Sequence, residues 1–336
     1  MSATPQTRRG RVLATSGIAG LVILVLGILA LALGDFPLTV GQVIGAFSGQ
    51  TVGLERTVVL EWRLPRAAAA AVFGAALAVA GAIFQTITRN PLASPDIIGL
   101  ANGSFTGMLV ALLLLGGSWP LLTAGSLIGG IVAAIVIYLL AFRGGLQGFR
   151  FIVVGIGVSA MLASANTWML LRADLDTALF ASAWGAGTLN TVTAATAIPA
   201  GLCVIGLLVL VPFLVAPLRQ LELGDDAARA TGAAVGPTRV AAIAIGVCLV
   251  SVVTAVAGPI AFVALAAPQV ARRLSRSPGI PFGASALVGG ALLLGSDLVA
   301  QHVIPLTVPV GVVTIVIGGA YLVWLLIHEA RRDARR

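Results

Sequence analysis

Leu218–Thr238 reads LRQLELGDDAARATGAAVGPT and is the longest polar interruption in a strongly apolar chain. Within it, residues 222–232 have the pattern of a short amphipathic helix, with two carboxylates at its start, alanines in its body and Gly232 as its stop. A polar helix between two apolar spans lies outside the lipid, where another protein can hold it. A solvated surface turn is the simpler interpretation, and the residues alone leave both open.

The composition around this stretch is that of a polytopic membrane protein. The chain has 336 residues, 59% hydrophobic and only 10% charged, with a mean hydropathy of +1.07. Apolar runs of about 20 residues without strand-like alternation predict helices that span a membrane. We expect an all-α fold with ten transmembrane helices in one domain over residues 1–336. The expected spans are residues 12–33, 67–86, 97–115, 121–142, 151–171, 192–215, 240–257, 260–270, 282–302 and 310–327.

The arginines predict which side of the membrane each segment occupies. All 20 basic residues are arginines, and a cytoplasmic N-terminus places 16 of them inside and 4 outside. This predicts cytoplasmic termini at residues 1–11 and 328–336, and a cytoplasmic loop at 216–239 that contains the polar helix. The location would be the plasma or inner membrane. Because the arginines lie between spans, the net charge of +8 gives no reason to expect nucleic acid as a partner.

The residue types that are missing exclude several kinds of chemistry. Without lysine the chain cannot form a P-loop, whose lysine contacts the β- and γ-phosphates, or a Schiff base. Two histidines and two cysteines are too few for a usual structural zinc site. Both cysteines lie inside apolar runs, where an inert thiol is the usual case. We therefore expect no catalytic residue, no metal and no directly bound cofactor.

Two interruptions of the apolar pattern resemble each other. The sequence NPLA at 90–93 follows the second span, and GPIA at 258–261 follows the seventh. Proline prevents a continuous helix at both places, and we expect Asp96 to cap the third span. Because five spans separate the two copies, they would be inverted repeats, an arrangement common in transporters. Chance similarity over four residues is the alternative.

Polar residues inside the spans each permit two interpretations. Ser159 and Asn166 are seven residues apart, on one face of the fifth span, with Thr167 next to them. These three residues either line a translocation path or bond neighbouring helices together. Asp297, in the outer half of the ninth span, is either a proton site or a partner in a structural hydrogen bond.

Several long motifs follow one another along the chain. They are RLPR at 63–66, GAIFQxxxRNPLASPD at 81–96, GDDAA at 224–228, GPIAFVAL at 258–265 and PVGVVT at 309–314. With these motifs, nearly the whole chain after the first span resembles the FecCD-type permeases. These are the membrane subunits of ATP-binding-cassette (ABC) importers for ferric siderophores, haem and cobalamin. FRxIxxGIG from residue 149 and NTWxLL at 166–171 are most similar to ferric-enterobactin-type permeases.

The resemblance implies a dimer of ten-helix permeases that moves a ferric siderophore. Two cytoplasmic ATPase subunits would hydrolyse the ATP, and an external binding protein would deliver the cargo. Arg63 and Arg66 match external arginines that receive carboxylates of the binding protein; the alternative is a lipid-headgroup contact or an ion pair with Glu61. The polar helix matches the coupling helix that docks on the ATPase. Coupling residues would be Glu222, Asp225, Asp226, Ala227, Ala228, Arg229 and Gly232.

Two departures from the family pattern concern the partners. PQVAR at 268–272 replaces the frequent P-H-x-x-R, and Gln301 stands where a third docking arginine is common. Docking would then depend on a second, similar permease, so a heterodimer is expected and a homodimer stays open. Haem or cobalamin as cargo is one alternative function. A secondary transporter driven by protons through Asp297 is another, and an intramembrane enzyme is the weakest.

Overall fold

The structure is a computed structural model that describes residues 5–96, 98–141, 148–305 and 308–333. Residues 1–4, 142–147 and 334–336 of the expected cytoplasmic segments lie outside the described residues. Every regular element in the described residues is helical. The elements are α1 (Pro5–Ala32), α2 (Val40–Ser48), α3 (Leu54–Thr57), η1 (Val58–Arg63), α4 (Leu64–Thr88), α5 (Leu100–Leu114), α6 (Trp119–Ala141), α7 (Gly148–Arg172), α8 (Leu175–Gly185), α9 (Ala194–Glu222), α10 (Asp225–Ala230), α11 (Val235–Ala257), α12 (Val263–Ser275), α13 (Phe282–His302) and α14 (Val310–Asp333).

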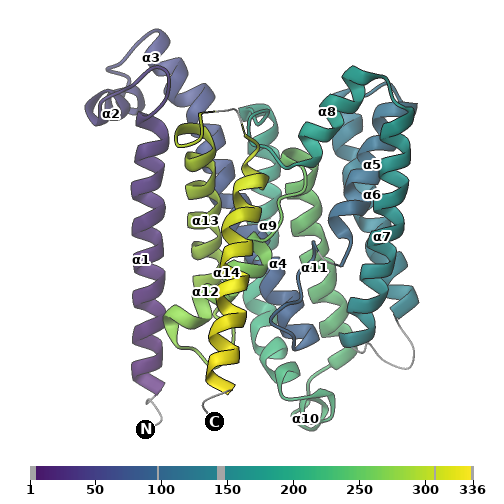
Figure 1. Ribbon diagram of the computed structural model, residues 1–336. Coiled ribbons are helices and arrows are strands. Elements are labelled where there is room, and N and C mark those ends of the chain that lie inside the picture. The colour runs from purple at the N-terminus through teal and green to yellow at the C-terminus, as the bar shows by residue number, and fades with distance from the viewer. Residues whose placement is uncertain (1–4, 97, 142–147, 306–307, 334–336) are drawn as a thin grey trace.

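The long helices run roughly along one axis (Figure 1). Both chain ends lie at the end of the bundle that also holds α10, while α2 and α3 lie at the opposite end. This agrees with the expectation that the termini and the polar helix share one side of the membrane. We call the α10 end the inner end and the α2 end the outer end.

Each of the ten expected spans coincides with a helix, but ten crossings are not confirmed. Within the described residues, seven helices are long and apolar enough to cross a membrane. The apolar helices at Leu100–Leu114 and Val310–Trp324 are shorter. Helix α12 has 13 residues and ends in a basic turn. Length and composition therefore support a polytopic membrane protein without fixing the number of crossings.

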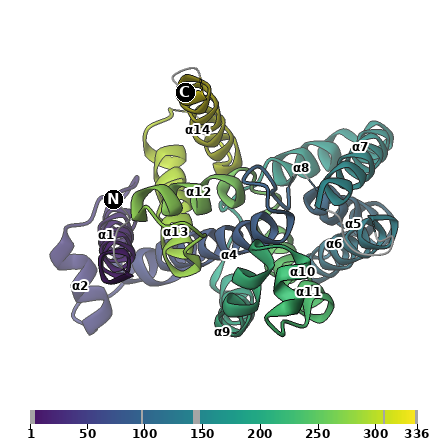
Figure 2. The same ribbon diagram turned by 90° about the horizontal axis from the view of Figure 1, so that it is seen from below.

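Helix α4 is the centre of the bundle, and its small residues explain why. Side chains along most of its length are buried, including the fully buried Phe73. A Cβ atom on Gly74 would collide with the main chain of Gly289 in α13, and one on Gly81 with that of Ala264 in α12. Small residues thus permit the close backbone packing that holds helices together in lipid. Helix α1, at the edge of the bundle in Figure 2, is largely exposed.

Helices α5 and α6 pack through two short glycine motifs. Gly103 and Gly107 of α5 lie against Gly125 and Gly129 of α6. A Cβ atom on Gly107 would meet the carbonyl oxygen of Gly125, and one on Gly129 would meet that of Gly103. Each GxxxG motif is a weak signal in sequence, but the structure pairs the two as one helix–helix contact.

The segments between the expected spans at the outer end contain helices. Residues 34–66, between the first two expected spans, form α2, then a continuous helix through α3 and the π-helical η1 into α4. Val58 and Val59 of η1 are buried with residues of α1 and α2, and this apolar contact stabilises the early start of the helix. Residues 172–191, the second outer segment, contain α8.

Both predicted interruptions are present, but the expected capping of the third span is wrong. Gly99 is the N-cap of α5 and no side chain bonds there. Asp96 instead accepts the backbone N–H of Phe262, at 3.0 Å from Oδ2, in the interruption between α11 and α12. The two interruptions therefore meet, although 166 residues of sequence separate this donor and acceptor.

Candidate functional site

Helix α10 is the predicted polar helix, and its borders follow local chemistry. It begins at Asp225, after Gly224, whose φ of 115° is a conformation that glycine adopts most readily. Asp225 and Asp226 occupy the first turn, where carboxylates stabilise the helix dipole. Gly232 (φ 83°) follows the last turn, as the sequence predicts. Glu222, which was expected to start this helix, is instead the last residue of α9.

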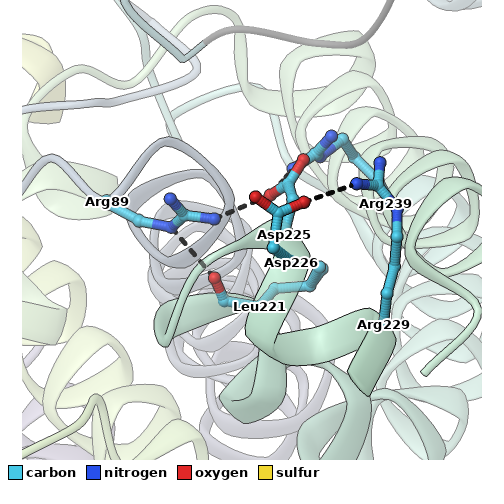
Figure 3. A network of polar contacts seen from close by, with 6 residues as sticks. All are labelled: Arg89, Leu221, Asp225, Asp226, Arg229 and Arg239. Atoms are coloured by element: carbon cyan, nitrogen blue, oxygen red, sulfur yellow. Dashed lines mark hydrogen bonds and ion pairs between the residues drawn. The ribbon is translucent and has the colours of Figure 1, made fainter. Parts of the chain in front are cut away.

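Asp225 joins three helices through one carboxylate oxygen (Figure 3). Its Oδ1 accepts hydrogen bonds from Nη2 of Arg89 at 2.7 Å and from Nη2 of Arg239 at 2.9 Å. Arg89 follows the last residue of α4, and its Nε also donates to the carbonyl oxygen of Leu221 at 2.9 Å. Arg239 is a buried residue of α11. We call Arg89, Asp225 and Arg239 the inner clamp.

The charges of the inner clamp set the ionisation of its carboxyl group. Burial by itself opposes the ionised form of Asp225. The hydrogen bond and charge of Arg239, together with those of Arg89, outweigh burial and hold the pKa of Asp225 below its ordinary value. The carboxylate is therefore charged at neutral pH, and α10 is tied to α4 and α11 by charge-assisted hydrogen bonds.

One face of helix α10 packs against the rest of the chain, and the opposite face is exposed. Ala228 is fully buried, and Thr231 Oγ1 donates to its carbonyl oxygen at 2.9 Å. Ala228, one of the predicted coupling residues, therefore packs against the core of the chain. Asp226 and Arg229 form an ion pair of 2.9 Å on the outside. We call the exposed set the outer face of α10, and its members are Asp226, Ala227, Arg229 and Ala230; the exposed Leu223 lies just before the helix.

Behind the inner clamp lies a polar cavity of about 240 Å³. Glu222 and Arg89 line it, and so do Gln85 of α4 and Gln269 of α12. Gln269 Nε2 donates to Gln85 Oε1 at 2.6 Å, and Gln85 Nε2 donates to the carbonyl oxygen of Leu265 at 3.1 Å. Gln269, which stands in the family's P-H-x-x-R position, thus connects α12 to α4 close to the clamp.

At the outer end, the two predicted docking arginines bind within the chain. Arg63 Nη1 donates to the carbonyl oxygen of Leu31, and Nη2 to that of Phe36, both at 2.8 Å, which binds the end of α1. Arg66 forms two hydrogen bonds with Asp297 of α13, from Nε at 2.9 Å and from Nη2 at 2.7 Å. In the described residues neither arginine pairs with Glu61.

The Arg66–Asp297 pair extends to a third residue and borders open space. Gln301 Nε2 donates to Asp297 Oδ2 at 2.7 Å. We call Arg66 and Asp297 the outer pair; the side-chain amide of Gln301 adds a third hydrogen bond to it. These contacts match the structural hydrogen bond expected as one interpretation of Asp297. Arg63 and Arg66 also line an outer cavity of about 610 Å³, together with Trp62 and His302.

The three predicted path residues of α7 do not act together. Asn102 Nδ2 of α5 donates to Ser159 Oγ at 2.8 Å, and Thr106 Oγ1 donates to Asn166 Oδ1 at 2.7 Å. Ser159 and Asn166 therefore bond α7 to α5, the second interpretation of their polarity. Thr167 is exposed on another face, and its hydroxyl donates to the carbonyl oxygen of Ala163 in the same helix.

Sequence reasoning missed the arginines that hold α10. Arg89 and Arg239 entered the sequence argument only as markers of the cytoplasmic side. Arg89 was nevertheless visible in the RNPLASPD motif, and Arg239 stands directly before the expected span 240–257. The partner of Asp297 was also missed, because a sequence does not show that residues 66 and 297 are neighbours.

Comparison with known proteins identifies the family. The FecCD transport family matches residues 22–328. The chain is 45% identical to the ferric enterobactin transport system permease protein FepG of Escherichia coli over 92% of this chain and 94% of FepG. It is 37% identical to the iron(3+)-hydroxamate import system permease protein FhuB of the same organism, over 81% of this chain and 42% of FhuB.

A solved structure agrees in fold. A metal-chelate type ABC transporter in an inward-facing conformation superposes with a TM-score of 0.82 at 25% identity, over 94% of this chain and 98% of that chain. A polytopic helical bundle, a family match over most of the sequence and a relative of nearly equal length therefore agree. The chain belongs to the FecCD transport family and is a membrane permease of that family.

Proposed function

We propose that the chain is the membrane subunit of an ATP-driven importer and that its cargo is a ferric siderophore of the ferric enterobactin type. The observation that supports this most is the arrangement of α10. It lies at the end of the bundle where both termini lie, two arginines bind its Asp225, and Asp226, Ala227, Arg229 and Ala230 are exposed. The similarity to FepG supports the choice of cargo.

The coupling step is assigned to the loop 216–239 of the single permease domain. One of the two cytoplasmic ATPase subunits of the complex would bind the outer face of α10, where Asp226 and Arg229 present charge beside the strongly exposed Leu223. Ala228 and Asp225 would transmit the movement, because they join α10 to the bundle. ATP is hydrolysed on the partner, since this chain has no lysine for a P-loop.

The outer cavity is assigned to the external binding protein. Arg63 and Arg66 give its wall positive charge, and acidic side chains of a partner would be steered to it. Each guanidinium also forms hydrogen bonds within the chain, so docking would use the N–H groups that these hydrogen bonds do not occupy. A second, similar permease completes the dimer, and the glutamine at position 301 in place of an arginine favours a heterodimer.

The alternatives have less support. Haem or cobalamin as cargo would need a binding protein of that specificity, and the relatives named above concern ferric enterobactin and iron(3+)-hydroxamate. A proton-driven transporter would use Asp297, but both oxygens of this carboxylate already accept hydrogen bonds from Arg66. An enzyme would need reactive groups, and the described residues contain no cluster of three or more metal-binding side chains.

The test is uptake of radioactive ferric enterobactin into proteoliposomes. The complex contains this chain with the ATPase, second permease and binding protein from the same organism. We expect uptake to require ATP and to fall at least about tenfold in Ala227→Arg, because a bulky charge on the outer face blocks docking. Ala227→Ser keeps a small side chain at the same place and serves as the matched control, with uptake close to wild type.

Two results would contradict the proposal. Uptake that follows a pH gradient and ignores ATP would favour the proton-driven alternative. Uptake that Ala227→Arg leaves at the wild-type level, in a complex of normal composition, would remove the coupling role from α10. Ala228 is unsuited to this test, because its burial means that a larger side chain disturbs the chain's own packing.

A further inference from the structure

The interruption between α11 and α12 contains a strained residue. Phe262 has a φ of 68°, in the left-handed region that bulky side chains rarely adopt. It immediately precedes α12, and its side chain lies against Gly318 of α14, where a Cβ atom would collide with it. Such strain persists where the surrounding structure holds it, and it concentrates at sites that change conformation.

Main-chain contacts hold one side of this interruption. Thr188 donates its N–H to the carbonyl oxygen of Ala257, the last residue of α11, at 2.7 Å. A Cβ atom on Gly187 would collide with the carbonyl oxygen of Pro259. The segment that follows α8 therefore fixes the start of the interruption, at Ala257 and Pro259, but it does not reach Phe262.

A side chain from the other interruption holds Phe262. Asp96 Oδ2 accepts the Phe262 N–H at 3.0 Å. Asp96 forms no ion pair in the described residues, unlike Asp225 and Asp297. The Asp96 carboxyl group connects the two interruptions through its hydrogen bond to the strained residue Phe262.

The same short segment begins at the inner clamp. Residues 89–96 connect Arg89, which binds Asp225 of α10, to Asp96, which binds Phe262. The segment is compact, because Asn90 Oδ1 accepts the N–H of Leu92 at 2.9 Å and the Asn90 carbonyl oxygen accepts the N–H of Ala93 at 3.1 Å. A displacement of α10 can therefore reach the beginning of α12 through eight residues.

We propose that Asp96 is a positioning residue for transport: by accepting the Phe262 amide, it transmits the displacement of α10, through Arg89 and the 89–96 segment, to the beginning of α12. This inference rests on the proposed coupling role of α10. In this role Asp96 acts through the backbone of Phe262. Its loss leaves the ATPase docked and active but disconnects hydrolysis from the movement of α12.

The experiment measures ATP hydrolysis and ferric enterobactin uptake in the same proteoliposomes that contain the complete complex. In Asp96→Ala we expect uptake to fall about tenfold while ATP hydrolysis stays within about twofold of wild type. Asp96→Asn retains an oxygen that can accept the amide hydrogen, so it restores most of the uptake. A merely structural role would lower both activities together through loss of intact complex.

Phe262→Gly provides the second arm. Glycine adopts the left-handed conformation without support, so Asp96→Ala reduces uptake less in the Phe262→Gly background than in the wild-type background. Equal reductions in both backgrounds, or wild-type uptake in Asp96→Ala, would overturn the role of Asp96. If the wild-type complex itself shows no ATP-dependent uptake, the proposed function fails, and the inference fails with it. If the Asp96→Ala complex does not assemble, Asp96→Asn is compared with wild type in both backgrounds. Uptake in Asp96→Asn as low as in liposomes without the complex would overturn the proposal.

Discussion

The two ends of α4 each bind an aspartate through an arginine, but they do so in different surroundings. At the outer end, Arg66 binds Asp297, with side chains 20% and 2% exposed. At the inner end, Arg89 binds Asp225, with side chains 43% and 31% exposed. The outer contact is bidentate and joins two helices. The inner contact uses one carboxylate oxygen, which two arginines share.

This difference separates a fixed joint from a movable one. A bidentate pair sets the relative orientation of both groups, and in a buried place it resists separation because each charge would be left without water. A partly exposed carboxylate can exchange an arginine for water at small cost. We therefore interpret the outer pair as the anchor of α4 on α13, and the inner clamp as the contact that changes when α10 is displaced.

Removing the buried carboxylate has the largest expected effect. Asp297→Ala leaves the Arg66 guanidinium without its partner, and because this guanidinium borders the outer cavity we expect a cost of about 2 kcal/mol, below the about 3–5 kcal/mol of a fully buried pair. We expect a clear fall in the thermal unfolding temperature of the purified protein in detergent. The yield of folded protein in the membrane should fall with it.

A double replacement distinguishes charge from packing. Arg66→Met combined with Asp297→Leu removes both charges and fills the space with apolar groups, which is often neutral for stability. We expect this variant to unfold close to the wild-type temperature. If Asp297→Ala unfolds at the wild-type temperature, or if the double variant is as unstable as Asp297→Ala, the outer pair is not the anchor described above.

The sequence predicts much of this architecture because the governing signals are local. Apolar run length locates the helices, the prolines locate both interruptions, and Gly232 marks the end of α10. The early start of the second helix was missed because residues 34–66 contain charges, while its stability comes from the burial of Val58 and Val59 against distant segments. Tertiary contact outweighed local polarity there.

The contacts of the site could be predicted only in part. The resemblance indicates which helix meets a partner, but it does not show that Ala228 faces inward. Asp96 was expected to cap the nearest helix, since capping is a local interaction. It binds Phe262 instead, because the fold brings the two interruptions together. Long-range partners such as Arg66 with Asp297 need the fold before they can be seen.

The inner clamp has an intermediate expected effect that depends on pH. The pKa of Asp225 is lower in the folded protein than its ordinary value, so its stabilisation is fully present above the ordinary carboxyl pKa of about 3.9. It is lost as the pH falls through the lowered pKa. We expect Asp225→Ala to reduce stability by about 1 kcal/mol near neutral pH, because solvent screens the partly exposed contact.

Thermal unfolding of wild type and Asp225→Ala at several pH values checks this sign. The difference between the two unfolding temperatures should stay constant from pH 8 to about 5 and shrink as the pH falls below the ordinary carboxyl pKa of about 3.9. A difference that grows on acidification would show that the carboxyl group stabilises the fold in its protonated form. The inner clamp would then be something other than a charge contact.

The smallest expected effect concerns Asp226, the neighbour of Asp225 in the sequence. Its ion pair with Arg229 is on the surface and connects residues of one short helix, and such pairs contribute little to stability. We expect Asp226→Ala to lower the unfolding temperature only slightly near neutral pH, and less than Asp225→Ala does. Because Asp225 and Asp226 are adjacent carboxylates, any difference between their alanine variants measures what the two arginines and partial burial add. If both variants lower the unfolding temperature equally, the stabilisation comes from negative charge at the start of α10, and the clamp would not be what holds this helix to α4 and α11.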